Sequence, residues 1–311
     1  MAKRMILKSI GWVYMVVGVT VAMMSFGKAV AQHPTPSVFD DDNLAAWCVV
    51  PFDAAQRSPE ERAVMLAELG IKKLAYDWRD EHVPLFDREW KALLKNEVEL
   101  FAFWLPFNTD PVNEEHVQEV FAFLERNQIR TQLWVLPGWF AGYENLIEGF
   151  DAMSHEEKVE SIAEPLRYVA QRAKALGCTV GLYNHGGWFG EPENQIAIIE
   201  HLGFDNVGMV YNFQHGRHHI DRFSKFYPKM QPHLLCINLV GLTHGEPVVV
   251  APLGEGDLEF ELLETIVASG YNGPISIQNH RSDRDAREAL IDERKGLDKI
   301  KESITNRLIK F

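Results

Sequence analysis

Short apolar stretches and longer amphipathic stretches alternate along the chain between residues 44 and 311. Each apolar stretch is bounded by glycine, proline or polar residues, a pattern that is typical of a buried β-strand. The pattern predicts eight strands, at Ala45–Phe52, Ile71–Trp78, Val98–Phe107, Ile129–Leu136, Thr179–Asn184, Val207–Asn212, His233–Asn238 and Pro274–Gln278.

The amphipathic stretches carry signals for the start and the end of helices. Ser58 precedes Pro59 and two glutamates, which indicates an N-terminal cap, and Gly70 is a typical C-terminal stop. A helix is predicted after each strand, at Ser58–Gly70, Asp87–Asn96, Glu114–Arg126, Ser154–Gly177, Glu193–Gly203, Arg217–Met230, Leu258–Ser269 and Asp285–Lys310.

Regular alternation of strands and helices indicates an α/β protein with a parallel sheet. With eight of each, a (β/α)8 TIM barrel in a single domain over residues 44–311 is the simplest architecture. An open doubly wound sheet is the alternative, but no G-x-G-x-x-G turn follows the first predicted strand. The segment Pro137–Asp151 is long and rich in glycine and aromatic residues, and we expect a lid there.

The last four strands allow a test of this interpretation. Because side chains alternate along a strand, placing Tyr183, Asn212, Asn238 and Gln278 inward also turns the second residue before each of them inward. The residues between them, such as Leu182, then face the helices. Apolar side chains thus cover the helix side, and four polar side chains meet at the carboxyl end of the barrel.

The N-terminus has the features of a secretory signal peptide over residues 1–31. Basic residues precede an apolar run, and Ala29-Val30-Ala31 is a typical cleavage site before a leader at residues 32–43. The sequence therefore predicts an exported protein, periplasmic or secreted, with no membrane attachment after cleavage. An N-terminal anchor helix is the alternative, although the apolar run is short for a membrane span.

The net charge argues against one class of partner, and the cysteine spacing argues against metal and disulfide sites. The net charge of −13 disfavours nucleic acid, because an acidic surface repels phosphate backbones. Cys48, Cys178 and Cys236 are far apart and lie in apolar stretches without metal-binding or disulfide spacing. We expect them to be core residues.

Four segments carry a resemblance to a known family. They are Asn184-His185-Gly186-Gly187 after the fifth strand, Tyr211–His215 after the sixth, Pro252–Leu258, and Gly270–Ile277 entering the eighth. These segments resemble the xylose isomerase-like TIM-barrel family of sugar isomerases and epimerases, with similarity over roughly residues 44–290. The resemblance implies proton transfer beside a sugar carbonyl at a divalent metal held by Glu, Asp, His and Glu.

This sequence departs from the family at all four ligand positions. Tyr183, Asn212, Asn238 and Gln278 stand there, and phenol and amide groups are poor ligands for Mg²⁺ or Mn²⁺. We therefore predict no cofactor and no metal at the family's usual site. Amides offer donors and acceptors together, so these residues and Asn184 are predicted to bind an uncharged ligand with many hydroxyl groups.

Histidines at the ends of strands are the natural proton carriers near neutral pH. His215 is the first candidate catalytic residue, because the family keeps a histidine near the substrate there, and His185 is the second. His280 and His244 are candidate substrate-binding residues. The alternatives are local hydrogen bonds to neighbouring loops, or a relocated metal site of His185, His215 and His280 with Glu81.

A charged cluster follows the second strand. Asp77 and Glu81 are candidate catalytic carboxylates that would orient a histidine or take a proton, and Arg79 is a candidate substrate-binding residue. The alternative is a structural cluster of salt bridges at the rim of the barrel.

Tryptophans are concentrated on or after the first five strands. Aromatic faces at the open end of a barrel can stack on sugar rings, so Trp47, Trp104 and Trp188 are candidate substrate-binding residues. Some of these tryptophans are expected to point into the helix layer instead.

Together these features predict an exported sugar isomerase or epimerase that acts on a small-molecule carbohydrate or keto-sugar by acid–base proton transfer. A lyase or hydratase needs the same proton abstraction and is the second functional hypothesis. A carbohydrate-binding barrel without catalysis is the third. Metal-dependent phosphodiester cleavage is disfavoured by the acidic charge and the missing ligands. The sequence makes no prediction about the oligomeric state.

Overall fold

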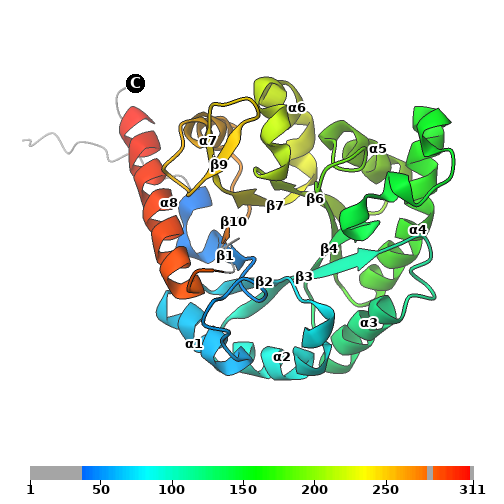
Figure 1. Cartoon of the computed structure of the whole chain (residues 1–311), viewed down its shortest axis with the longest axis horizontal. Helices are drawn as coiled ribbons and strands as arrows, with labels where there is room; N and C mark the ends of the chain where they lie inside the picture. Colours follow the sequence, from blue (N-terminus) through cyan, green and yellow to red (C-terminus); the bar gives the residue numbers. More distant parts are fainter. Residues whose placement is uncertain (1–36, 279–282, 309–311) are drawn as a thin grey trace, which may run out of the picture. The chain divides into compact units, whose positions relative to one another are not determined.

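The computed structural model describes residues 37–278 and 283–308. Its centre is a closed barrel in the order β1-β10-β7-β6-β5-β4-β3-β2, with every neighbouring pair parallel. Figure 1 looks down on the barrel with the helices arranged around it. The barrel strands are β1 (Leu44–Trp47), β2 (Lys73–Tyr76), β3 (Glu99–Phe107), β4 (Gln132–Pro137), β5 (Thr179–Tyr183), β6 (Val207–Asn212), β7 (Leu234–Leu239) and β10 (Ile275–Gln278).

Helices follow the barrel strands as the sequence predicts, and two of them begin with serine caps, of which the one at Ser58 was predicted. Ser58 and Ser154 each form a capping box with the glutamate three residues later, which satisfies the first free N–H groups of α1 and α4. The helices are α1 (Pro59–Glu68), α2 (Phe86–Lys95), α3 (Glu115–Asn127), α4 (His155–Ala175), α5 (Pro192–Leu202), α6 (Phe223–Met230), α7 (Leu258–Ala268) and α8 (Ala286–Leu308).

Three local features differ from the sequence prediction, and the first is that β1 ends at Trp47 instead of Phe52. The segment after β6 is a 3₁₀ helix at His215–Arg222, and α6 starts only at Phe223. After β7 an antiparallel hairpin of β8 (Gly241–Thr243) and β9 (Val249–Ala251) was not predicted. Its strands are three residues long and Val249 is exposed, so no period of alternating burial marks them in the sequence.

The core has an inner and an outer part, and the predicted register is confirmed. Tyr183, Val210 and Cys236 belong to the cluster inside the barrel, whereas Leu182 and Tyr211 belong to the cluster between the strands and helices. The three cysteines are buried and free, as expected. Parallel strands covered on both sides explain why each strand reads as an almost continuous apolar run.

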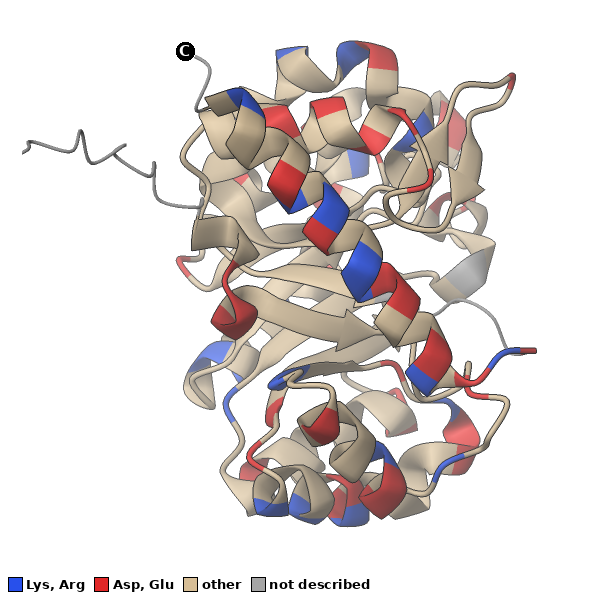
Figure 2. Cartoon of the chain, turned by 90° about the vertical axis from the view of Figure 1, so that its left-hand side faces the viewer, with Lys and Arg blue, Asp and Glu red and all other residues tan. Residues whose placement is uncertain are grey.

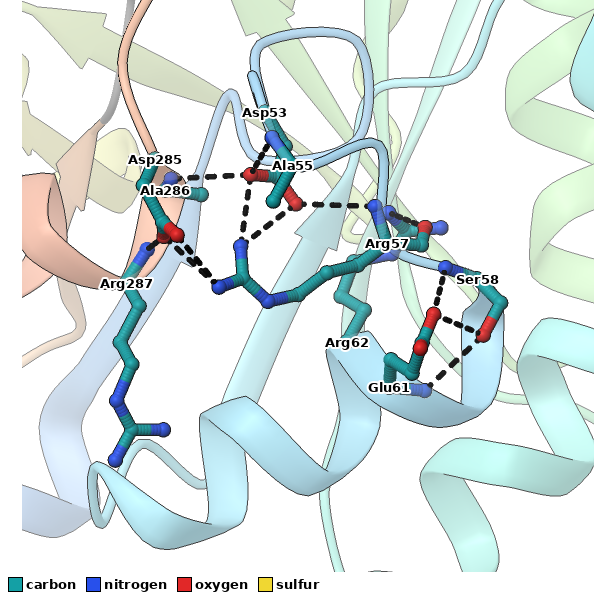
Figure 3. A network of polar contacts seen from close by, with 9 residues as sticks. All are labelled: Asp53, Ala55, Arg57, Ser58, Glu61, Arg62, Asp285, Ala286 and Arg287. Carbon is teal, nitrogen blue, oxygen red and sulfur yellow. Dashed lines mark hydrogen bonds and ion pairs between the residues drawn. The ribbon is translucent and has the colours of Figure 1, made fainter.

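The barrel closes where β1 pairs with β10, and an ion network next to this seam joins the first loop to the last helix (Figure 3). The Asp53 carboxylate accepts hydrogen bonds from the backbone N–H groups of Ala55, Arg57 and Ala286, the last at the start of α8. The Arg57 guanidinium donates to Asp53 and, through its second nitrogen at 2.9 Å, to both carboxylate oxygens of Asp285. The network therefore holds the two ends of the barrel domain together.

Charged residues lie on the helices and loops, and acidic and basic residues alternate along α8 (Figure 2). Among the barrel strands, Lys73 and Glu99 are the charged residues, both at the first position of their strand. None of the described helices is long and apolar enough to cross a membrane.

Candidate functional site

The mouth of the barrel is its open end, at the carboxyl ends of the strands. Aromatic rings inside the barrel close the bottom of this mouth. The Trp47 ring lies 5.0 Å from that of Trp134, 5.8 Å from that of Tyr183 and 6.1 Å from that of Trp104, measured between ring centroids. Trp47 and Trp104 are each 3% exposed, so they form the floor of the mouth and contact each other edge to face. Trp188 lies elsewhere, half-buried against Phe150 and His155 outside the inner core.

Above this floor, the ends of β5, β6 and β7 form a buried polar network. The Asn212 amide nitrogen donates to the Tyr183 hydroxyl at 2.5 Å, and Asn212 Oδ1 accepts from the backbone N–H of Gln214. Asn238 Oδ1 accepts from the Ser276 hydroxyl at 2.6 Å. Uncharged hydrogen-bonding groups therefore stand at three of the four predicted positions. The fourth, Gln278, ends β10, and its side chain is outside what the structure describes.

The Tyr183 hydroxyl is the centre of this network. Burial raises its pKa, whereas the Asn212 and Asn238 amides and the Trp47 indole, which face the oxygen, act in the opposite direction. Asn238 Nδ2 and Trp47 Nε1 make no hydrogen bond of ordinary geometry within the described part of the chain. The neutral phenol is therefore the stable form, surrounded by N–H donors.

Asn184 has a different position from its neighbours. Its side-chain oxygen accepts from the Asn212 N–H at 2.7 Å and its nitrogen donates to the Asn212 carbonyl at 3.2 Å. The side chain is completely buried. Its amide pairs with both backbone groups of Asn212, as the backbone of a neighbouring strand would. Asn184 thus holds the end of β6, and with it the Asn212 side chain, in place.

The two histidines predicted as proton carriers lie together. The rings of His185 and His215 are 4.3 Å apart between centroids, and both contact the Tyr183 ring, at 6.3 Å and 5.7 Å. His185 follows β5 and His215 opens the 3₁₀ segment after β6, so adjacent parallel strands bring them to the same end of the barrel. Both are half-buried, which leaves the pair accessible to a ligand.

Asp77 stands across the mouth, just after β2. The side chain is 1% exposed, and burial raises its pKa to about 7 despite the opposing charge of Arg79. Neither carboxylate oxygen makes a hydrogen bond of ordinary geometry with a described residue, although the Cys48 thiol and the backbone at Val50 lie close enough to lower the pKa slightly. Asp77 can therefore hold or release a proton near neutral pH.

Arg79 lies over aromatic rings beside Asp77. Its guanidinium carbon is 5.1 Å from the Trp104 ring and 5.8 Å from the Phe52 ring, a cation–π arrangement on both. One of its nitrogens donates to the backbone carbonyls of Asp77 and Trp78. The charge is thereby held at the edge of the mouth.

Two of the remaining predicted residues, Glu81 and His244, are exposed rather than buried at the strand ends. Glu81 is exposed on the 3₁₀ segment Asp80–Leu85, next to His82. His244 is exposed between β8 and β9, where its backbone N–H binds Asp257. His280 lies outside the described residues. The roles of these three residues stay predictions.

The described strand-end side chains do not fit a divalent cation. The amide N–H groups of Asn212 and Asn238 face the Tyr183 hydroxyl, while their carbonyl oxygens bind Gln214 and Ser276. A cation needs converging oxygen or nitrogen lone pairs, and N–H groups offer none. The described residues likewise contain no group of three or more His, Cys, Asp or Glu side chains able to hold a metal.

Two residues near the mouth were missed from the sequence. From the sequence we expect Cys48 to be an ordinary core residue. In the structure its backbone has a left-handed φ of 56°, and its thiol affects the pKa values of both Asp77 and Tyr183. Glu144 is in the loop predicted as a lid, yet one of its carboxylate oxygens is buried without a partner. No sequence signal distinguishes it from the exposed Glu148 of the same loop.

Closed parallel strands with alternating helices define a (β/α)8 barrel, here with polar groups at the carboxyl ends of the strands. The chain matches the model of the xylose isomerase-like TIM barrel family over residues 66–300, and it belongs to this family. A comparison with curated protein sequences finds no match.

Several solved structures share the fold. The 3-keto-D-glucoside 4-epimerase from E. coli has 14% sequence identity and a TM-score of 0.61, over 81% of this chain and 99% of that one. D-psicose 3-epimerase from Clostridium cellulolyticum H10, solved with D-tagatose, has 13% identity and a TM-score of 0.53, over 84% and 96%. The probable 3-DHS dehydratase from Bacillus anthracis has 13% identity and a TM-score of 0.58, over 82% and 98%. At these identities the likeness concerns the fold.

Proposed function

We propose that this protein is a carbohydrate isomerase or epimerase that moves a proton beside a sugar carbonyl without the divalent metal typical of its family. The observation that carries the proposal is the His185–His215 pair, 4.3 Å apart above the Tyr183–Asn212 hydrogen bond. Proton carriers next to uncharged donors and acceptors match a substrate with many hydroxyl groups and an acidic C–H. The epimerases among the structural neighbours support the same class of reaction.

In the proposed mechanism His215 removes the proton next to the carbonyl, and His185 or Asp77 returns a proton. The proton goes to the neighbouring carbon in an isomerisation and to the opposite face of the same carbon in an epimerisation. A carboxyl with a pKa of about 7 is present in both protonation states at neutral pH, as such a step requires. Tyr183 and Asn212 would bind the carbonyl or hydroxyl oxygens, and Arg79 would face the developing negative charge from the rim. Loss of a hydroxyl after the same abstraction would give a lyase, so the product identifies the reaction.

The test is deuterium exchange. The wild-type protein is incubated with aldoses, ketoses and keto-sugars in deuterated water, with and without a chelator, and the sugars are analysed by NMR spectroscopy and mass spectrometry. We expect exchange that survives the chelator and falls about 10²-fold or more in His215→Ala. His201→Ala is the control, since His201 lies on α5 and pairs with Glu160 outside the mouth.

Two results would contradict the proposal. Sugar binding without exchange across the panel would make the protein a carbohydrate-binding barrel. Exchange that disappears with the chelator and returns with Mg²⁺ or Mn²⁺ would show a metal site and overturn the metal-free mechanism.

We also propose that the protein is exported. The basic start, apolar run and Ala29-Val30-Ala31 of residues 1–31 support this, and they lie outside the described residues. Expression of the full chain with its own N-terminus, followed by N-terminal sequencing, is expected to give Gln32 as the first residue of the mature protein. An uncleaved chain in the cell membrane would contradict cleavage and favour an anchor.

A further inference from the structure

Two loops enclose a cavity beside the histidine pair, at the carboxyl ends of β4 and β5. The loop after β4 contributes Trp139, Tyr143 and Glu144, and the loop after β5 contributes His185 and Gly187. The cavity has a volume of about 160 Å³. A water molecule needs roughly 10–15 Å³ on this measure, so the cavity holds roughly ten water-sized groups, about the size of a small sugar.

The polar group that makes this cavity unusual is the Glu144 carboxylate. Its Oε2 is buried and has no hydrogen-bond partner among the described residues. Unpartnered buried polar atoms are rare in proteins, because the loss of water is not compensated. A carboxylate in the wall of a cavity can obtain the missing hydrogen bonds from a ligand.

The chain is built to bring this carboxylate close to the loop after β5. Gly187 has a φ of 62°, and a Cβ atom there would overlap Glu144 Oε1, so only glycine leaves room for it. The loop after β4 is itself anchored, because the Tyr143 hydroxyl donates to the Ser161 carbonyl of α4 at 2.8 Å. Phe150 packs on Trp188 of the opposite loop at 5.7 Å. Glu144 is thus held in place by both loops.

The lining indicates the chemistry of the occupant. A carboxylate attracts hydroxyl donors and repels phosphate and carboxylate groups, so the cavity favours an uncharged sugar over a sugar phosphate. Trp139 and Phe189 add apolar surface of the kind that packs on sugar C–H groups. His185 lines the cavity and contacts His215, so the cavity adjoins the proposed reacting end.

We propose that this cavity is the subsite for the hydroxyl-bearing end of a neutral sugar, with Glu144 accepting hydrogen bonds from its hydroxyl groups. The inference rests on the proposed function for the class of ligand. It assigns Glu144 a role in binding and specificity, while the histidine pair carries the proton.

Binding is measured by isothermal titration with D-fructose, D-glucose and D-xylose, and separately with their phosphates. Glu144→Ala is expected to weaken binding of the neutral sugars about tenfold to a hundredfold, as for loss of hydrogen bonds to a charged group. Glu148→Ala, an exposed glutamate of the same loop, is the matched control and is expected to bind normally.

A second pair of variants tests the position of the carboxylate rather than its charge. Gly187→Ala is expected to displace Glu144 and to weaken binding as Glu144→Ala does. Gly203→Ala is its control, because Gly203 has nearly the same φ of 63° and nothing within 4 Å of the added Cβ. The same backbone strain without the displaced carboxylate is expected to leave binding unchanged.

Thermal unfolding separates a binding role from a structural one. Truncating an unpartnered buried carboxylate that serves a ligand is expected to leave the melting temperature unchanged or raise it, whereas loss of a structural group lowers it. The subsite is overturned if Glu144→Ala binds normally, if the phosphates bind more tightly than the neutral sugars, or if no neutral sugar binds the wild type. Deuterium exchange with normal binding in Glu144→Ala would leave the proposed function standing and reject the subsite alone. If Glu144→Ala weakens sugar binding but the wild type shows no deuterium exchange, the subsite stands and the proposed function is rejected.

Discussion

The carboxyl group of Asp77 is buried at the end of β2, where its pKa is raised to about 7. An acid with a raised pKa keeps its proton in the folded state over a pH range in which the unfolded chain has already lost it. The folded protein therefore binds more protons between about pH 4 and pH 7, and the free energy of unfolding falls as the pH rises through this range. Above about pH 7 the loss is complete, and it amounts to about 4 kcal/mol for a shift of this size.

Asp77→Asn is expected to lower the activity if Asp77 rather than His185 returns the proton, and to stabilise the protein at alkaline pH. The amide has the same shape but no charge to desolvate, so the variant should be more stable than the wild type by up to about 4 kcal/mol near pH 8 and similar near pH 4. Urea unfolding across this pH range measures the difference, and deuterium exchange measures the activity.

The control for Asp77→Asn is a carboxylate whose pKa is lowered, rather than raised, in the folded protein. Arg57 lowers the pKa of Asp285, so Asp285→Asn should lose stability near pH 8 rather than gain it. An Asp77→Asn variant with unchanged stability at both pH values would show that the carboxyl is not desolvated.

At the level of secondary structure, one side chain joins the ends of two strands. Asn184 binds both backbone groups of Asn212, at 2.7 Å and 3.2 Å, without exposure to solvent. Asn184→Ala leaves a buried N–H and a buried carbonyl without partners, so we expect a loss of about 2 kcal/mol in the free energy of unfolding. Urea denaturation of the variant and the wild type tests this value.

The exposed Asn113, whose side chain donates to Asp110, provides the control. Asn113→Ala is expected to change stability by less than about 0.5 kcal/mol, as is usual for surface positions. If Asn184→Ala is equally harmless, the two strands are joined by their backbone pairing alone.

At the level of the whole molecule, the barrel must close between its first and last strands. Arg57 links Asp53 of the first loop with Asp285 before α8, and the Asp53 side chain is 1% exposed (Figure 3). Arg57→Ala leaves this buried carboxylate with backbone donors only, and we expect a loss of about 2 kcal/mol, between the values for exposed and buried ion pairs. Hydrogen exchange at the start of α8 should increase in the same variant.

The control for closure is an ion pair on the surface. Lys174 and Asp205 are 2.7 Å apart with side chains 52% and 78% exposed, so Lys174→Ala should lose at most about 0.5 kcal/mol. Equal losses in both variants would mean that the network at the seam has no special part in closing the barrel.

The order of strands and helices follows directly from local patterns. Apolar runs between turn residues, and the caps at Ser58 and Ser154, are decided within a few residues of the chain, so their positions could be predicted. The register of β5 to β7 was also predictable, because alternation along each strand leaves only one face for Tyr183, Asn212 and Asn238. The hairpin β8–β9 was not, because strands of three residues are too short to show an alternating pattern.

Only the tertiary structure decided which side chains from different loops contact each other and which of them are buried. The sequence by itself determined the barrel, the inward polar residues and the histidines at strand ends. It did not determine that His185 and His215 would touch, that Asp77 would be desolvated, or that Glu144 would reach Gly187. Contacts, burial and pKa depend on residues distant in the chain, and a local pattern carries no information about the neighbours that folding provides.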